Sequence, residues 1–228
     1  MAYGSRDQIL ENLASIRTGI ARAADRSGRD PAQLTLVAVA KTVPVVPVRW
    51  VVDAGVEDVG ENYVQELRAK AQAVPNARWH FIGTLQTNSA HHVAAHAAVV
   101  HSVTGGRATE RLARRAAGSG RTLDALVEVD FTSERTGVHP SDLPSLVDRV
   151  ARLEGLRLIG LMTLPPLSES PEDARSSFVR LRRLRDRIRE KHPDVLALSM
   201  GMSLDYEVAV EEGATIVRIG TALFGPRM

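Results

Sequence analysis

Cysteine is absent from this sequence of 228 residues. Its absence excludes disulfides, thiolate nucleophiles and cysteine zinc sites. A metal would therefore need histidine and carboxylate ligands. The histidines His91, His92 and His96 include an i,i+4 pair of the kind that binds zinc on a helix, but neither an HExxH pattern nor a third ligand accompanies them. We expect no metal site.

A strong charge of one sign and a long apolar run are also missing. Lysine and arginine exceed aspartate and glutamate by only 29 to 27, a surplus too small to attract nucleic acid or anionic lipid. No stretch approaches the roughly 18 apolar residues of a membrane span, and the polar start SRDQ (5–8) is unlike a signal peptide. We expect a cytoplasmic protein that binds a small molecule, with no nucleic-acid or membrane partner.

From residue 34 onward, short apolar runs alternate with amphipathic segments. Several runs are almost continuously hydrophobic, which is typical of parallel strands covered on both faces. They are LTLVAVA (34–40), EDVGEN (57–62), RWHFIG (78–83), AVVHSV (98–103), LDALVEV (123–129), LRLIGLM (156–162), VLALSM (195–200) and TIVRIG (215–220). Eight such units in roughly 200 residues fit a (β/α)8 TIM barrel, whereas an open doubly wound sheet usually has fewer strands. The sequence predicts one α/β domain, residues 1–228, with this barrel.

Two segments carry clear helix signals. Residues 5–27 repeat apolar side chains at helical spacing, and Ser5 with Gln8 can form a capping box, so we expect an extra N-terminal helix before the barrel. Residues 171–191 form the second, with Ser170 as a possible cap and Pro171 in the first turn.

A lysine follows the first predicted strand. In a (β/α)8 barrel the reacting groups lie at the carboxyl ends of the strands. Lys41 comes directly after the run that ends at Ala40. At the barrel mouth the ammonium would be partly desolvated, which lowers its pKa and makes the amine a nucleophile toward an aldehyde. The ordinary alternative is a solvated surface charge.

The last two strands end in residues suited to phosphate, which such barrels usually bind there. Gly201 and Gly220 allow close approach of the backbone, and Ser203 and Thr221 add hydroxyl donors beside them. The alternative is that both glycines only form turns.

Two further polar residues fall inside predicted strands. Arg218 lies between two apolar residues in the last strand, so it needs buried acceptors or a structural salt bridge. His80 lies in the third strand, where a hydrogen-bonded core histidine and a ligand contact are equally compatible with its position.

Several ordered motifs resemble the pyridoxal phosphate homeostasis protein family, also called the proline synthase co-transcribed homologue family, whose barrel is related to the alanine racemase N-terminal domain. The resemblance covers nearly the whole chain. Its motifs are VAVAKTVP (37–44), GENYVQE (60–66), WHFIGTLQTN (79–88), HSV (101–103), GLMTLPP (160–166), SMGMSLDYEVAVEEGAT (199–215) and VRIGTALFG (217–225).

The resemblance implies that pyridoxal 5'-phosphate is bound as a Schiff base on Lys41. It also implies that Arg218 faces the pyridine nitrogen, and that the remaining cofactor contacts come from the phosphate-binding residues Ser203, Gly220 and Thr221 and from the lining residues Asn62, Met162 and Met202. An arginine cannot maintain a protonated pyridinium as an aspartate does, so we expect a weaker electron sink than in transaminases.

Racemisation in larger relatives of this barrel needs a second base, a tyrosine from an additional domain. The sequence ends at Met228, soon after the last strand, and its tyrosines, Tyr3, Tyr63 and Tyr206, lie outside matching motifs. The resemblance therefore implies a carrier acting in vitamin B6 and amino-acid homeostasis, with little catalysis. Apo-enzymes would be its recipients, and we expect a monomer or weak dimer.

Two other functions remain open at this stage. One is a racemase-like pyridoxal phosphate enzyme with an unidentified amino-acid substrate. The other is a Schiff-base aldolase acting on a phosphorylated sugar, although its lysine usually follows a later strand. The chain also departs from its relatives, many of which have His at Thr84, Lys at Ser89 and a KxGF motif where this chain has RTGV (135–138). These departures put in doubt properties that need a basic group at the barrel mouth.

Overall fold

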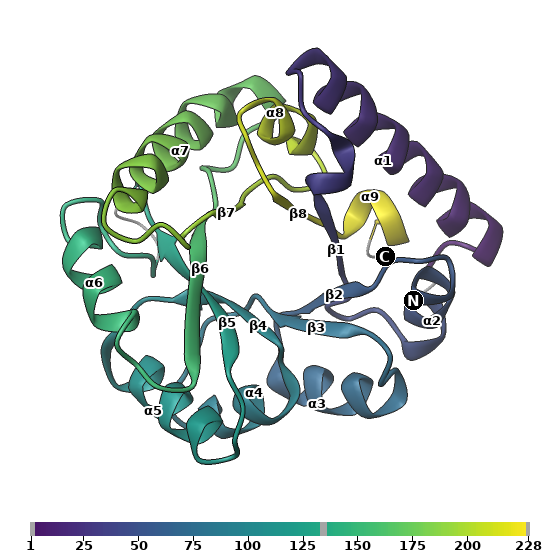
Figure 1. Ribbon diagram of the computed structural model, residues 1–228. Coiled ribbons are helices and arrows are strands. Elements are labelled where there is room, and N and C mark those ends of the chain that lie inside the picture. Colours follow the sequence, from purple (N-terminus) through teal and green to yellow (C-terminus); the bar gives the residue numbers. More distant parts are fainter. Residues whose placement is uncertain (1–2, 133–135, 227–228) are drawn as a thin grey trace.

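The computed structural model describes residues 3–132 and 136–226, so Arg135 and Met228 lie outside the described residues. Eight parallel strands form a closed barrel in sequence order, with β8 paired to β1 (Figure 1). The strands are β1 (Thr35–Val39), β2 (Asp58–Glu61), β3 (Arg78–Phe81), β4 (Val99–Val103), β5 (Leu123–Val129), β6 (Leu156–Thr163), β7 (Ala197–Ser199) and β8 (Ile216–Ile219). The predicted barrel is confirmed, and each predicted strand is present.

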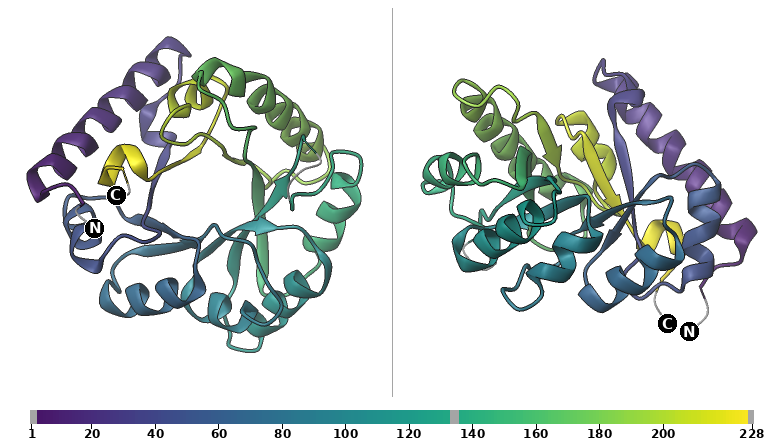
Figure 2. Two further views of the ribbon diagram at one scale, coloured as in Figure 1. Left: turned by 180° about the vertical axis from the view of Figure 1, so that it is seen from behind. Right: turned by 60° about the horizontal axis from the view of Figure 1, so that its bottom comes forward.

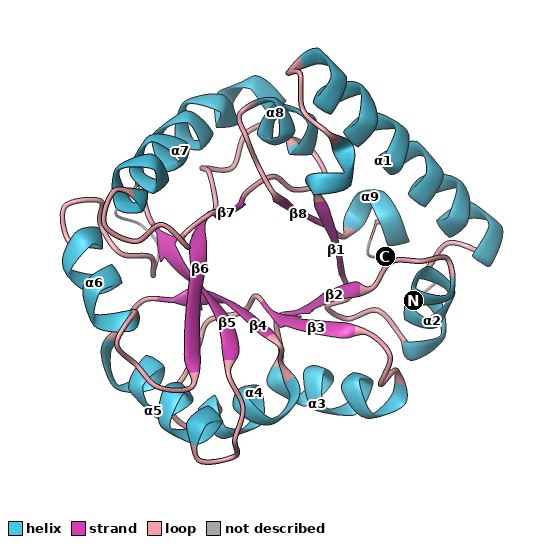
Figure 3. Cartoon of the chain, viewed as in Figure 1, coloured by secondary structure: helices cyan, strands magenta, loops and turns pink. Residues whose placement is uncertain are grey.

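The helices surround the strands on the outside (Figure 3). They are α1 (Arg6–Arg26), α2 (Val45–Asp53), α3 (Val64–Ala73), α4 (Ala90–His96), α5 (Gly106–Ala117), α6 (Leu143–Val150), α7 (Arg175–Arg189), α8 (Tyr206–Glu211) and α9 (Thr221–Phe224), with 3-10 turns η1 (Pro31–Gln33) and η2 (Pro171–Ala174). In residues 3–132 and 136–226, no helix combines the length and the apolar character needed to cross a membrane.

The predicted N-terminal helix is α1, and Ser5 caps it by accepting a hydrogen bond from the Gln8 amide at 3.2 Å. The Gln8 side chain donates to Asn12 rather than closing the capping box. One face of α1 is buried against α2, α8 and α9, and this packing brings the first and last helices side by side (Figure 2). Its buried apolar residues include Ile9, Leu13, Ile16 and Ile20.

The second predicted helix differs at its start. Residues 171–174 form the 3-10 turn η2, and the α-helix begins only at Arg175. The φ that Pro171 imposes is compatible with the first turn of either kind of helix. The Ser170 side chain makes no capping hydrogen bond within the described part of the chain, so the prediction of a Ser170 cap is wrong there.

Two apolar clusters hold the barrel together. The larger fills the space between the strands and the helices. The smaller joins side chains from strands on different sides of the barrel, so it lies in the barrel interior: Val37, Val99, Leu126, Met162 and Ile216. Burial on both faces explains why the strand sequences are almost continuously hydrophobic.

Candidate functional site

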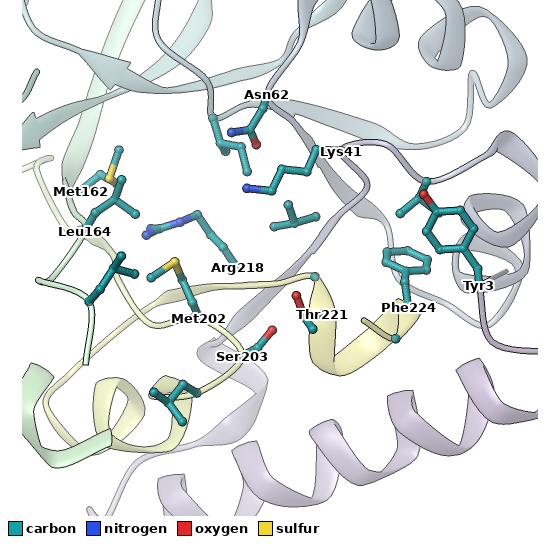
Figure 4. Close-up of a pocket in the computed structure, with 17 residues that line it drawn as sticks. Tyr3, Lys41, Asn62, Met162, Leu164, Met202, Ser203, Arg218, Thr221 and Phe224 are labelled. Carbon is teal, nitrogen blue, oxygen red and sulfur yellow. The ribbon is translucent and has the colours of Figure 1, made fainter. Parts of the chain in front are cut away.

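A cavity of about 410 Å³ lies at the carboxyl ends of the strands (Figure 4). All eight residues predicted for the site line it: Lys41, Asn62, Met162, Met202, Ser203, Arg218, Gly220 and Thr221. They follow or end β1, β2, β6, β7 and β8. The barrel thus brings together residues that are up to 180 positions apart in the chain, from Lys41 to Thr221.

Sequence reasoning missed the other residues that line the cavity, most of which are apolar: Tyr3, Val39, Val43, Ile82, Leu164, Leu167, Leu204, Phe224 and Gly225. Several fall inside the recognised motifs, and this is the signal that could have found them. Tyr3 precedes every motif. Its hydroxyl donates to the Thr42 carbonyl, which ties the start of the chain to the turn after β1.

Lys41 occupies a tight turn at the end of β1. The Val43 amide donates to the Ala40 carbonyl at 2.9 Å. Thr42 has φ 66°, the only positive φ of a non-glycine residue in the described chain, which costs energy in a residue with a Cβ. Glu66 accepts a hydrogen bond from the Thr42 amide at 2.8 Å. A side chain from α3 therefore holds the turn that directs Lys41 into the cavity (Figure 4).

A second lysine lies behind this turn. The Lys70 ammonium donates to Glu61 at 2.5 Å, to Glu66 at 2.6 Å and to the Ala40 carbonyl at 2.7 Å. Glu61 is fully buried, and burial raises the pKa of its carboxyl to about 7, with Lys70 opposing the rise. Lys70 is thus bonded to three oxygen atoms, and its bond to the Ala40 carbonyl anchors the residue that follows β1. Lys70 does not line the cavity.

The Asn62 side chain lines the cavity opposite Met202 in the view of Figure 4. Its Oδ1 atom is buried, and no residue of the described chain donates a hydrogen bond to it. Gly83 allows this backbone position, because a Cβ at residue 83 would lie 2.0 Å from the Asn62 carbonyl oxygen. Buried polar atoms are normally hydrogen-bonded, so the Asn62 Oδ1 atom is suited to accept a hydrogen bond from a bound molecule or water.

Arg218 enters the cavity from β8 and is almost fully buried. Its guanidinium donates to the Ser199 hydroxyl and, at 3.0 Å, to the Thr163 carbonyl. Burial lowers its pKa to about 10, with Asp205 and Glu128 opposing the fall, so the group stays charged at neutral pH. No carboxylate of residues 3–132 and 136–226 lies within 4.0 Å of it, so the alternative of a structural salt bridge is wrong for this part of the chain.

His80 is satisfied by protein groups within the barrel. Its Nδ1 lies 2.8 Å from His101 Nε2, and its Nε2 lies 2.7 Å from Asp58 Oδ1. It does not line the cavity, so of the two alternatives the hydrogen-bonded core histidine is correct.

The ends of β7 and β8 meet at one side of the cavity. Gly201 has φ 92°, and a Cβ there would lie 2.5 Å from the Ala209 Cβ, so only glycine fits. The Ser203 hydroxyl accepts a hydrogen bond from the Ala222 amide at 3.1 Å, which joins the loop after β7 to the helix α9 after β8. A Cβ at Gly220 would lie 3.3 Å from the Val39 carbonyl oxygen. Small and hydroxyl-bearing residues therefore form this wall, as the sequence predicted.

Thr84 and Ser89, the positions that depart from many relatives, line a neighbouring cavity of about 460 Å³ together with Asn62, His91 and His92. No group of three or more histidine, aspartate and glutamate side chains arranged to hold a metal occurs in residues 3–132 and 136–226.

The family model for the alanine racemase N-terminal domain matches residues 11–228. The pyridoxal phosphate homeostasis protein of Aquifex aeolicus is 40% identical over 222 residues, which cover 95% of this chain and 97% of the relative. The protein of that name from Pseudomonas aeruginosa is 41% identical over 223 residues, covering 96% of each chain.

Solved structures agree with these relatives. PipY of Synechococcus elongatus, solved with PLP bound, has a TM-score of 0.85 and 34% identity, covering 95% of this chain and all of PipY. Alanine racemase of Clostridium difficile superposes with a TM-score of 0.78 at 15% identity, covering 97% of this chain and 60% of the racemase in one structure, which shows the shared fold alone. The chain belongs to the pyridoxal phosphate homeostasis protein family, with a barrel of the alanine racemase N-terminal type.

Proposed function

We propose that this protein binds pyridoxal 5'-phosphate as a Schiff base on Lys41 and serves as a carrier in vitamin B6 and amino-acid homeostasis. One observation carries the proposal. Lys41, Lys70 and Lys191 are the only lysines of the sequence. Lys41 alone among them lines the cavity, whereas Lys70 is bonded to three oxygen atoms and Lys191 pairs with Asp148 on the surface.

The residues of the cavity fit the cofactor. When bound, pyridoxal phosphate supplies an aldehyde that condenses with an amine and a ring that withdraws electrons. Ser203, Thr221 and the backbone at Gly220 would hold the phosphate, a role supported by the glycine geometry of this wall. Asn62 Oδ1, a buried acceptor, would bind a donor of the cofactor, and Met162 and Met202 would line the ring.

Arg218 would face the ring nitrogen. Its guanidinium has only donors and remains charged, so it hydrogen-bonds a nitrogen that carries no proton. A ring in that state withdraws electrons weakly, which favours holding the cofactor over turning over an amino acid.

The tyrosines support the same conclusion. Tyr3 is the only tyrosine that lines the cavity in the described chain, and its hydroxyl is bonded to the Thr42 carbonyl at the side away from Arg218 (Figure 4). The alternative, a racemase-like enzyme, needs a second proton-transferring group beside the cofactor.

The protein would do this in the cytoplasm. Residues 1–228 would act as one cofactor-binding domain, as a monomer or weak dimer. Apo-enzymes that need pyridoxal phosphate would be its recipients.

The test uses the purified full chain incubated with pyridoxal phosphate. We expect a visible absorption band that survives desalting in the wild type and in the surface control Lys191→Ala, and that is absent from Lys41→Ala. Borohydride reduction followed by peptide mass analysis should place the cofactor on the peptide that contains Lys41. A wild type that stays colourless, or a label on Lys70 or Lys191, would overturn the proposal.

A second measurement separates carrier from enzyme. The loaded protein is incubated with an apo-transaminase, and with single amino acids followed by chiral chromatography. A carrier restores transaminase activity and leaves each amino acid unchanged. Steady conversion of an L- to a D-amino acid would instead favour the racemase-like alternative.

A further inference from the structure

A chain of hydrogen bonds crosses the barrel interior from the cavity to the opposite end of the barrel. Arg218 donates to the Ser199 hydroxyl, and Ser199 Oγ lies 2.9 Å from His101 Nδ1. His101 Nε2 lies 2.8 Å from His80 Nδ1, and His80 Nε2 lies 2.7 Å from Asp58 Oδ1. These residues come from five strands or strand ends, β8, β7, β4, β3 and β2.

This chain of hydrogen bonds is buried away from solvent along most of its length. Ser199 and His101 are fully buried, and His80 and Arg218 are nearly so. Asp58 is the first residue of β2, at the amino end of the barrel, and it lines a separate cavity there. The charged groups around it are Arg78, which lies 3.5 Å from its carboxylate, and Asp124, which is bonded to Arg78 at 2.6 Å.

The chemistry of the two ends fixes the direction of each hydrogen bond. A carboxylate only accepts, so His80 Nε2 must carry a proton and donate to Asp58. Burial lowers the pKa of both imidazoles, and that of His101 most strongly, so both rings are neutral. His80 Nδ1 is then an acceptor and His101 Nε2–H is its donor.

The remaining hydrogen bonds run in the same direction as far as the cavity. His101 Nδ1 must accept, and the Ser199 hydroxyl is its donor. The Ser199 oxygen in turn accepts from Arg218, whose guanidinium has donors only. Every donor thus points from Arg218 toward Asp58, and each bond strengthens the next in a medium of low dielectric constant.

We propose that Ser199, His101, His80 and Asp58 are positioning residues that fix the Arg218 guanidinium and polarise it toward the far end of the barrel. This inference rests on the proposed function for the identity of the group that Arg218 meets. Two of the five guanidinium donors are held by Ser199 and Thr163, which orients the rest of the group in the cavity. The charge of Asp58 at the opposite end of the barrel is therefore coupled to the contact with the ring nitrogen.

The donor-to-acceptor direction of these hydrogen bonds is tested without cofactor. Nitrogen-15 NMR of the full-length apo-protein at pH 7, with His80 and His101 assigned by the loss of their signals in His80→Gln and His101→Gln, should show both rings as neutral Nε2–H tautomers. A Nδ1–H tautomer or a charged ring at either position would overturn the proposal. This readout holds even if the protein takes up no pyridoxal phosphate, so it separates failure of the chain from failure of the proposed function.

The coupling to the cavity is tested with pyridoxal phosphate. We expect Ser199→Ala to bind it roughly tenfold more weakly, because a hydrogen bond to a charged group is lost, and to shift the absorption maximum of the bound form. The matched control is Ser102→Ala, which removes a buried hydroxyl on β4 that donates to the Gly83 carbonyl. Ser102 takes no part in the chain of hydrogen bonds from Arg218 to Asp58. Equal effects of the two variants on retention and spectrum would assign Ser199 a structural role only.

Asp58→Asn provides a variant at the solvent-accessible end, where folding is least at risk. Asparagine keeps an acceptor for His80 but removes the charge. We expect about fivefold weaker retention, as a charged acceptor is replaced by a neutral one, and a spectral shift in the same direction as that of Ser199→Ala. An unchanged spectrum and affinity in Asp58→Asn would show that no polarisation reaches Arg218.

Discussion

At the scale of single residues, Glu61 is a carboxyl group removed from solvent. It is fully buried and bonded to Lys70, and its pKa is raised to about 7 from an ordinary value of 4.5. The folded state therefore holds its proton more tightly than the unfolded state does. The stabilising contribution of this group is complete below about pH 4.5 and is lost as the pH rises through about 7.

We expect Glu61→Gln to remove this dependence. Relative to the variant, the free energy of unfolding of the wild type should fall by roughly 3 kcal/mol between pH 4.5 and 7, since one pKa unit corresponds to about 1.36 kcal/mol. Urea denaturation at a series of pH values measures it. Glu57→Gln, at an exposed position just before β2, is the control and should keep the wild-type slope. An identical slope in Glu61→Gln would contradict the raised pKa.

Single residues of the site could be predicted from the sequence where their position at the end of a strand is enough to place them in the cavity. Lys41 follows an apolar strand, and the fold alone carries the end of that strand to the cavity. The spacing of Glu66 and Lys70 also indicates a helical ion pair. The contact of His80 with His101 could not be predicted, because it depends on which residues of neighbouring strands face inward at the same level of the barrel.

Among the elements, β6 contains the most restrictive packing position. Its register with β5 shifts between Ala125 and Leu126, so that Leu158 and Gly160 pair with consecutive residues and Ile159 is the extra residue of a bulge. Gly160 then faces β7, where a Cβ would lie 2.1 Å from the Ala197 carbonyl oxygen. The backbones of β6 and β7 approach this closely only because residue 160 has no side chain.

We expect Gly160→Ala to destabilise the protein by roughly 3 kcal/mol, because the added methyl group meets backbone atoms that cannot rotate away. The reduced entropy of the unfolded chain would favour alanine by less than this. Denaturant unfolding measures the difference, with Gly4→Ala as the control, whose Cβ would make only ordinary contacts at 3.5 Å. A variant as stable as the wild type would show that the β6–β7 contact can relax.

The elements themselves were predictable from hydrophobic pattern, since parallel strands between helices are apolar on both faces. Their details were not. The apolar run at 156–162 contains no sign of the bulge, because hydrophobicity does not specify register. The turn η2 replaces the first α-helical turn predicted at residue 171. The sequence could not decide between them, because the φ of proline fits both kinds of helix.

In the whole molecule, the cavity spans the seam where the barrel closes. Val37 of β1 pairs with Arg218 of β8, and Lys41 follows the same β1 strand. A ligand held by Lys41 and Arg218 therefore connects the first and last strands. Because such a ligand binds only the closed barrel, it stabilises the folded state by mass action.

We expect pyridoxal phosphate at 100 times its dissociation constant to add about 2.7 kcal/mol of stability and to raise the Tm by roughly 5–10 °C for a chain of this size. Differential scanning calorimetry measures the change. Lys41→Ala, and the wild type with pyridoxal lacking the phosphate, should show a smaller rise. Equal shifts in all three samples would place the stabilising interaction elsewhere.

The two ends of the described chain are tied together beside this seam, where the Gly4 amide donates to the Phe224 carbonyl at 3.4 Å. A short peptide linker could join them, and new ends could be opened at the Gly120 turn, where glycine has φ 68° and no atom within 4 Å of a would-be side chain. In such a circular permutant β8 would be followed by α9, the linker, α1, η1 and β1 in one continuous order. The arginine and the lysine of the site would then lie in one continuous segment, which could be expressed and engineered as a cassette.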